Sequence, residues 1–498
     1  KTLMEAEDSG RVRVLRSAGG PCEAGITPPR CVLYHMSRSV RADANHALEH
    51  AARLSTEKEL PLVVCFALTD HYPGATERAY AFFLDGLACV QRTLARRGIS
   101  LHVMHASASE GPEVVPRLVT CAARALDAHT VVVDRGYTQV CRAWRAAIAR
   151  DAPPGARVVQ VESDAVVPVD LASKRLEPSA ASLRSKIEHL LDRFLTPEPP
   201  SLPPPQAEGA RQASAALEAP LREALAVLGA SILPAPLDVE ATLQSLRLDR
   251  SVPRVPAGLA EPGGALAAKR TLARFIRDGL RGYAARRNEP GLAVTSRISA
   301  FLHFGHVSPV TVARAVRAAK GSSVQDRAKF LDELIVRREL ALNYALHCKG
   351  RYDQYEDAVP EWARRSLEHA SEAPLLGHPA ALEPAALVRG ESPCGLWNLA
   401  QWELVATGFM HNYLRMFWAK KLLEWLPPER AFRFAVETND RWQLDGRDPN
   451  GWLGVAWCFG RGDRPFPPRR HFGAVRPMAE KSIASRKDVD AYARRVRA

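Results

Sequence analysis

Tryptophan is concentrated at the carboxyl-terminal end of this chain. Seven of the nine indoles lie between residue 396 and the end, interspersed with arginine, aspartate and asparagine. Trp418 and Trp425 are seven residues apart in an apolar segment, which predicts a spacing of about 10 Å along one helix face. Together with Trp397 on the preceding predicted helix, they could carry an electron between a buried redox cofactor and the surface. The alternative interpretation is that they are ordinary core aromatics.

An arginine and an aspartate in the same region could hold the ring of such a cofactor. Arg415 lies three residues before Trp418 and shares its helix face. Asp445 begins the turn-forming string Asp-Gly-Arg-Asp-Pro-Asn-Gly at 445–451. A buried pair of these side chains would stabilise a flavin anion and orient the ring. A structural salt bridge is the alternative.

Residues 295–299, Thr-Ser-Arg-Ile-Ser, precede an apolar helical turn. Clustered hydroxyls and an arginine near a helix start could bind a pyrophosphate through side-chain and backbone donors. An ordinary N-cap would have the same composition. The chain contains no Gly-x-Gly-x-x-Gly or Walker-type loop, which disfavours dinucleotide binding of that type and nucleotide hydrolysis.

Glu339 lies in the apolar helical segment 334–340. Its carboxyl group could bond a substrate base, or it could form an ion pair with a nearby arginine. His303, His306 and His411 do not have the spacing of metal ligands, so we expect no metal site.

Composition indicates a soluble globular protein. A length of 498 residues predicts two or three domains, and no apolar run is long enough to span a membrane. The charged amino terminus does not resemble a secretory signal. Nine scattered cysteines without a Cys-x-x-Cys pair favour a reducing cytoplasm over a disulfide framework or a zinc site. The net charge of +13 favours a polyanionic partner, although arginine enrichment in a GC-rich genome would also explain it.

The order of apolar patterns predicts an α/β domain followed by an all-α domain. Short apolar runs alternate with helical segments from residue 31 to 161, which indicates a doubly wound, Rossmann-like parallel sheet. Six prolines within 197–206 indicate a connector, and helical periodicity dominates after it. We therefore expect a flexible tail at 1–27, an α/β domain at 28–196, a proline-rich linker at 197–215 and a helical domain at 216–498.

Taken together, these segments resemble a class II cyclobutane pyrimidine dimer photolyase of the cryptochrome/photolyase superfamily. The resemblance covers roughly residues 30 to 495 and is specific, because many strings agree in order and spacing. The strings are 32–36, 41–45, 134–137, 142–144, 161–164, 283, 287–290, 302–305, 333–341, 352–353, 360–363 and the tryptophan-rich last third.

The resemblance implies that the helical domain binds FAD and that Asn439 faces the flavin N5 atom. The implied flavin-binding residues are Tyr283, Ser296, Arg297, Ile298, Ser299, Arg338, Arg415, Asn439 and Asp445. Trp397, Trp418 and Trp425 match the chain of tryptophans that reduces the flavin in light. The implied lesion-binding residues are Glu339, Asn343, Met416 and Trp457. Glu339, Asn439 and the three tryptophans are the implied catalytic residues.

The implied partner is UV-damaged DNA, bound by a cytoplasmic, monomeric repair enzyme. Photoexcited reduced FAD would donate an electron that splits the cyclobutane ring, and the electron would return. A poorly stacked lesion costs less to extrude from the duplex than a normal base pair. The α/β domain would host a second, antenna chromophore, either a deazaflavin or a folate, if one binds.

Three positions depart from the family pattern. Asn412 stands where a glycine is usual, and Leu342 replaces an aspartate beside Asn343. The segment 458–466 is one residue short, with Phe466 in place of a tryptophan. A cryptochrome-like flavin photoreceptor without repair activity is therefore the alternative function. A helical nucleic-acid-binding protein without cofactor is a third, but it leaves the indoles unexplained.

Overall fold

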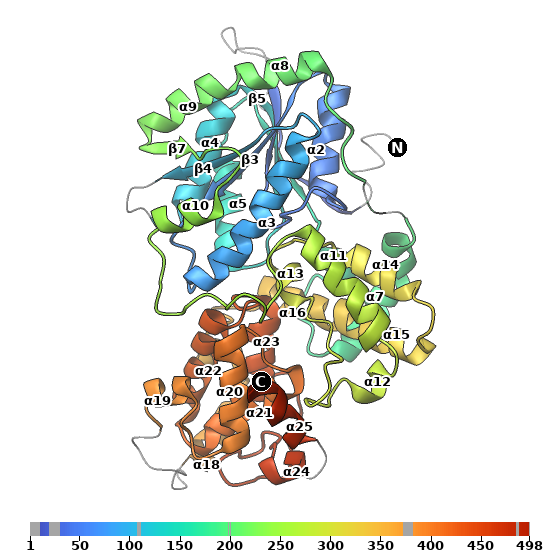
Figure 1. Ribbon diagram of the computed structural model, residues 1–498, viewed down its shortest axis with the longest axis vertical. Helices are drawn as coiled ribbons and strands as arrows, with labels where there is room; N and C mark the ends of the chain where they lie inside the picture. Colours follow the sequence, from blue (N-terminus) through green and yellow to red (C-terminus); the bar gives the residue numbers. More distant parts are fainter. Residues whose placement is uncertain are drawn as a thin grey trace.

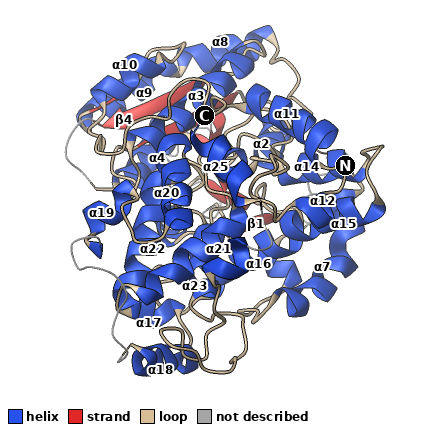
Figure 2. Ribbon diagram, turned by 60° about the horizontal axis from the view of Figure 1, so that its bottom comes forward, coloured by secondary structure: helices blue, strands red, loops and turns tan. Residues whose placement is uncertain are grey.

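The computed structural model describes residues 10–18, 30–106, 111–197, 199, 201–371, 382–484 and 488–497. A seven-stranded sheet with flanking helices forms one end of the molecule, and helices alone form the rest (Figure 1, Figure 2). This arrangement confirms the predicted fold class. None of the helices within these ranges is both long and apolar enough to cross a membrane.

The sheet has the order β1-β6-β5-β2-β3-β4-β7. Its strands are β1 (Val12–Arg16), β2 (Cys31–His35), β3 (Leu62–Leu68), β4 (Leu101–Ala106), β5 (Ala128–Asp134), β6 (Arg157–Val161) and β7 (Ala230–Ile232). The five inner strands are parallel, and the edge strands β1 and β7 pair antiparallel with them. Every residue of β2 and β3 is buried, as expected for parallel strands covered on both faces.

Helices cover both faces of the sheet. Apolar residues of α2 (His46–Glu57), α3 (Glu77–Ala95) and α10 (Val239–Ser245) share one core with the sheet. Apolar residues of α4 (Val114–Ala125), α5 (Gln139–Asp151) and α9 (Glu218–Val227) share the core on the opposite face. The sheet is therefore the middle of three layers, which is the doubly wound arrangement that the alternating pattern predicts.

The α/β layer differs from the expected range at both ends. Residues 12–16, expected in a flexible tail, form β1, whereas 1–9 and 19–27 of that tail lie outside the described residues. The helix α8 (Glu208–Ala216) occupies the second part of the expected linker, and β7 returns to the sheet inside the range expected to be helical. Strands this short at a sheet edge have too few residues to show a periodic pattern.

The helical part has two cores. One joins α7 (Ala180–Leu195), α11 (Ala265–Arg274), α13 (Ser299–His303), α14 (Pro309–Arg317) and α15 (Val324–Leu331). The other joins α16 (Arg338–His347), α17 (Tyr355–Ala358), α18 (Glu361–Ala370), α19 (Pro384–Arg389), α20 (Gly395–Thr407), α21 (Asn412–Lys421), α22 (Pro428–Trp442), α23 (Pro449–Cys458), α24 (Glu480–Ala484) and α25 (Val489–Arg497). The short helices α6 (Val169–Ala172) and α12 (Tyr283–Arg286) complete this part.

A buried arginine fastens the α/β layer to the helical part. Arg78, near the start of α3, donates to the main-chain oxygen of Pro253 at 2.7 Å and to that of Val405 at 2.7 Å. It also donates to the oxygens of Leu404 and Trp442, each at 3.2 Å. Because three of these carbonyls lie in the last turns of α20 and α22, a single guanidinium binds the ends of both helices. Residues 407–409, at the end of α20, and residues 444–445, after α22, line the candidate site.

Candidate functional site

A cavity of about 390 Å³ lies where several distant segments meet. Three of the predicted flavin-binding residues, Arg297, Ser299 and Asp445, line it. The other lining residues are Phe82, 258–262, Thr271, Arg274, 300–301, 407–409 and Leu444. The structure thus brings together residues as far apart in the sequence as Phe82 and Asp445, which are separated by 363 positions.

Arg415 and Asp445 form the expected ion pair at the edge of this cavity. The Nη2 atom of Arg415 lies 2.9 Å from Oδ1 of Asp445 and donates to Oε1 of Gln443 at 2.7 Å. Its Nε atom donates to the main-chain oxygen of Met410 at 3.1 Å. These contacts fix the guanidinium between α21 and the loop that follows α22. A charge-assisted pair held on three sides is suited to orient a flat anionic ring.

The segment 295–299 supplies a cation and a hydroxyl group. Arg297 has a left-handed backbone (φ 52°), and its guanidinium lies 4.2 Å from the ring centroid of Phe409. Ile298 is buried and anchors the segment in the core. Ser299 is exposed as the first residue of α13, a helix end with no side-chain cap. Ser296 accepts a long hydrogen bond from the amide of Ile298 at 3.5 Å and does not line the cavity.

A second guanidinium faces the same cavity. Arg274 of α11 lines the wall and pairs with Glu261 at 2.9 Å. Two arginines and the free hydroxyl of Ser299 within one cavity fit the diphosphate of FAD, since phosphate oxygens accept charge-assisted hydrogen bonds. No sequence pattern predicts a site role for Arg274, because it lies in the ordinary amphipathic helix α11, outside the 295–299 segment.

Tyr283 belongs to a separate polar cluster. Its hydroxyl donates to Oε2 of Glu333 at 2.7 Å, and Arg287 lies 2.9 Å from the other oxygen of that carboxylate. Burial raises the pKa of Tyr283 above its ordinary value. Glu333 lies in a π-helical turn, η2 (Asp332–Arg337), a geometry that recurs at functional sites. Glu333 lies six residues before Glu339, the carboxylate that the sequence predicts to bond a substrate base.

Three predicted site residues of α16 are turned away from the cavity. Glu339 is 1% exposed, and its Oε1 accepts from the amides of Val166 at 2.7 Å and Val167 at 3.0 Å. Arg338 donates to the main-chain oxygen of Asp164. Asn343 is 0% exposed, with its amide group bonded to the main chain of residues 175 and 177. In this arrangement all three bind the 164–177 segment, and the side chains of Glu339 and Asn343 are buried.

Asn439 is buried beneath the turn that carries Asp445. Its side chain donates to Oδ1 of Asp440 at 3.0 Å. A Cβ atom on Gly451 would lie 2.6 Å from Nδ2 of Asn439, so any larger residue at position 451 would displace the Asn439 side chain. The structure therefore places Asn439 directly behind the 445–451 turn.

Met416 and Trp457 lie on neighbouring helices, α21 and α23. Each is half-buried, and the Cys458 thiol lies 3.8 Å from the main-chain oxygen of Met416. Of the three departures, Asn412 is exposed as the first residue of α21, and Leu342 is buried in the core around α16. The guanidinium carbon of Arg476 lies over the ring of Phe466, 5.7 Å from the ring centroid.

The three predicted tryptophans are in mutual contact through Trp397. Its ring stacks on Trp418 with 5.8 Å between centroids and meets Trp425 edge-on at 5.4 Å. The prediction of one continuous helix face was wrong, because α21 ends at Lys421 and Trp425 follows a 3-10 turn. All three rings are buried, at 0% for Trp397, 4% for Trp418 and 2% for Trp425. The rings contact one another in the order Trp418, Trp397, Trp425, and Trp418 lies three residues after Arg415 in α21.

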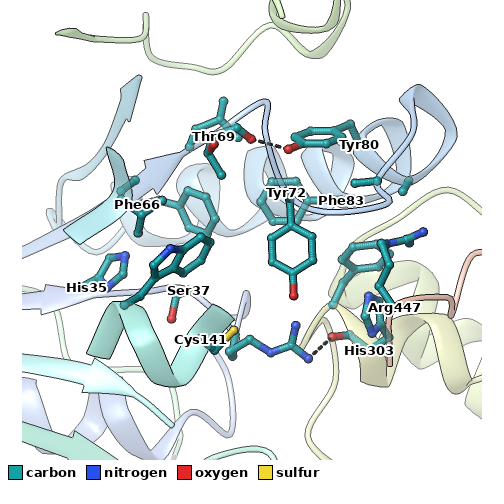
Figure 3. A pocket seen from close by; sticks show the side chains of 18 residues that line it. His35, Ser37, Phe66, Thr69, Tyr72, Tyr80, Phe83, Cys141, His303 and Arg447 are labelled. Carbon is teal, nitrogen blue, oxygen red and sulfur yellow. Dashed lines mark hydrogen bonds between the residues drawn. The ribbon is translucent and has the colours of Figure 1, made fainter. Parts of the chain in front are cut away.

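A second, aromatic cavity of about 100 Å³ lies between the sheet and the helical part (Figure 3). The rings of Phe66, Tyr72, Tyr80 and Phe83 surround it, with Arg447 and His303 on the helical side. Among the described residues, Nη2 of Arg447 and Nε1 of Trp144 are buried with no hydrogen-bond partner. Unpaired buried donors are costly, so this cavity fits a flat ring that carries oxygen acceptors.

Residues 32–206 match the family model of DNA photolyase. The chain is 36% identical to the deoxyribodipyrimidine photo-lyase of Methanothermobacter thermautotrophicus, covering 94% of both chains. It is 33% identical to that of Potorous tridactylus, covering 93% of this chain and 81% of the relative.

Two solved structures share the fold. A class III photolyase from Agrobacterium tumefaciens matches with a TM-score of 0.66 and 18% identity, covering 96% of this chain and 88% of that one. A Synechocystis cryptochrome matches with a TM-score of 0.63 and 18% identity, covering 89% and 84%. At this level of identity, these two matches show the fold alone.

The buried carboxyl group of Glu339 predicts a pH dependence of stability. Burial raises its pKa from 4.5 to about 8, so between these values folding takes up a proton. The free energy of unfolding then falls as the pH rises from 4.5 to about 8. Glu339→Gln, which stays neutral, should gain stability relative to wild type over this range in urea denaturation at pH 5 to 9. An unchanged difference between the two proteins across that series would contradict the assignment.

Proposed function

The chain belongs to the DNA photolyase family, and on that premise we propose that it splits cyclobutane pyrimidine dimers in DNA with reduced FAD and light. The observation that carries the proposal is the ion pair of Arg415 and Asp445, with stacked tryptophans next to it. A carboxylate-anchored guanidinium at a cavity edge, one helix turn from an indole, suits a protein that holds a flavin and supplies it with electrons.

The residues present fit FAD. Arg415 and Asp445 would hold the ring, and Asn439, behind the same turn, would set the polarity on that side. Arg297 and Ser299 would bind the diphosphate, together with Arg274. When bound, FAD supplies the excited-state electron for the cleavage. The chain's own residues orient the ring, neutralise the diphosphate and exclude water from the site.

The lesion would approach the side of the flavin site where Met416 and Trp457 lie. A half-buried indole offers a stacking face to an extruded base without reading its sequence. We propose that the separate cluster of Tyr283, Glu333 and Arg287 also borders the lesion site and that Glu333, which is half-exposed, bonds the lesion, because Glu339 is buried. The net charge of +13 supports binding to the DNA backbone.

The tryptophans would return the flavin to its reduced state. Trp418 is the member closest in sequence to Arg415, and its indole donates to Gln401 at 2.9 Å. Trp397 donates to the main-chain oxygen of Trp418 at 2.9 Å, which fixes both rings. Contacts between ring centroids below 6 Å support rapid electron transfer along this path.

The aromatic cavity is our candidate for the antenna chromophore. The free donors of Arg447 and Trp144 would meet the ring oxygens of a deazaflavin or a folate. Arg447 belongs to the turn that carries Asp445, so the two sites share one loop. The eight described cysteines are free, which supports a reducing compartment such as the cytoplasm.

Light-dependent repair tests the function. Purified, chemically reduced protein mixed with a thymine-dimer oligonucleotide should restore absorbance near 260 nm under blue light and not in darkness. Glu333→Gln should slow this repair by about tenfold, the usual effect of losing one charge-assisted hydrogen bond. Glu361→Gln, which changes an exposed carboxylate on α18, is the control. A photoreducible flavoprotein that leaves the dimer intact would instead indicate a photoreceptor.

Photoreduction tests the order of the tryptophans. Trp397→Phe should slow the light-driven reduction of oxidised flavin by more than about tenfold, because the path between Trp418 and Trp425 is interrupted. Repair by chemically reduced protein should remain. Trp402→Phe alters an indole that is 41% exposed on the same helix and should change neither rate. Photoreduction of Trp397→Phe at the wild-type rate would refute this path.

A further inference from the structure

The carboxyl-terminal helix α25 packs against the segment that leads to Arg297. Nη2 of Arg495 donates to the main-chain oxygen of Pro290 at 3.0 Å. A Cβ atom on Gly291 would lie 2.9 Å from the oxygen of Asp488, so the two segments touch through their main chains. Tyr492 is 0% exposed. Helix α25 therefore belongs to the wall behind the 291–299 segment.

Glu403, in the middle of α20, joins this helix to the cavity. Its carboxylate is 3% exposed. One oxygen accepts from the hydroxyl of Tyr492 at 2.9 Å and from the amide of His411 at 3.2 Å. The other lies 3.1 Å from Nη2 of Arg495 and 3.8 Å from Nη2 of Arg297. A buried carboxylate with these partners couples four segments, and losing one partner leaves a charge uncompensated.

Arg297 depends on this support more than an ordinary arginine would. Its left-handed backbone is unfavourable for a residue with a Cβ atom and persists only when the surroundings impose it. Its guanidinium is held between the ring of Phe409 on one side and Glu403 on the other. The direction in which Arg297 faces the cavity is therefore set by residues outside the cavity.

We propose that Glu403 and Arg495 are positioning residues for the cofactor site, and that α25 acts through them as a latch that keeps Arg297 directed at the diphosphate of FAD. The inference rests on the proposed flavin site. The inference goes beyond that site, because it gives α25 a role in retaining the dinucleotide. The proposal also predicts that losing the Arg495 contact weakens the binding of FAD but not of riboflavin, because riboflavin lacks the diphosphate that Arg297 would bind.

The test compares two neighbouring arginines of α25. Arg495→Gln should release FAD about tenfold faster than wild type, the factor expected for one charge-assisted contact. Its affinity for riboflavin should stay unchanged. Arg494→Gln, an exposed neighbour on the same helix, is the matched control and should release FAD at the wild-type rate. Flavin fluorescence after rapid dilution measures the release.

Hydrogen exchange adds a readout that needs no cofactor. In the flavin-free protein, amides of 291–299 should exchange faster in Glu403→Gln and Arg495→Gln than in Arg494→Gln. Tyr492→Phe, which removes only one hydroxyl, serves if the charge variants fold poorly, and it should accelerate both exchange and FAD release.

Equal FAD release by the Arg495 and Arg494 variants would overturn the latch while leaving the flavin site intact. A parallel loss of FAD and riboflavin affinity would also overturn it, since that result indicates general destabilisation. A wild-type chain that takes up no flavin would overturn the proposed function itself, and with it the role of Arg297.

Discussion

The ion pair between Arg415 and Asp445 is the interaction on which the site depends. It joins the start of α21 to the turn after α22, two segments whose positions are set by different parts of the molecule. Arg78 holds the ends of α20 and α22 from the α/β layer, and Gly451 lets α23 close over Asn439. The pair forms only because these separate packing contacts agree. A charge pair at the edge of a cavity is stable when both partners have further hydrogen bonds, as Arg415 has through Gln443.

Much of this arrangement could be predicted from the sequence. The parallel sheet followed from apolar runs such as 62–68, and the pairing of Arg415 with Asp445 followed from chemistry and resemblance. The short edge strand β7 could not be predicted, because three residues have no detectable period and need β4 as a template. Trp425 follows a 3-10 turn after Lys421, and residue propensities do not predict that turn.

The two glutamates of the 333–339 segment differ in exposure, and their sequence neighbours do not reveal this difference. Positions three and four residues from Glu339 are Ile335, Val336, Leu342 and Asn343, which are buried. The corresponding neighbours of Glu333 are the charged Lys329 and Arg337 and the buried Phe330 and Val336. Helical periodicity is therefore mixed around Glu333, and its exposure follows from tertiary packing. Residues from remote segments, such as Arg274 and Glu403, become visible only once the fold has brought them to the cavity.

The most direct test of the account is the binding of FAD by the Arg415 variant. Arg415→Met keeps an unbranched, flexible side chain and removes the charge that pairs with Asp445, whereas Arg433→Met does the same at an exposed position of α22. Titration with oxidised FAD, followed by quenching of flavin fluorescence, would compare both with wild type. We expect wild type and Arg433→Met to bind FAD equally, and Arg415→Met to lose at least about tenfold in affinity. Equal affinity in all three proteins would contradict the placement of the flavin ring at this ion pair.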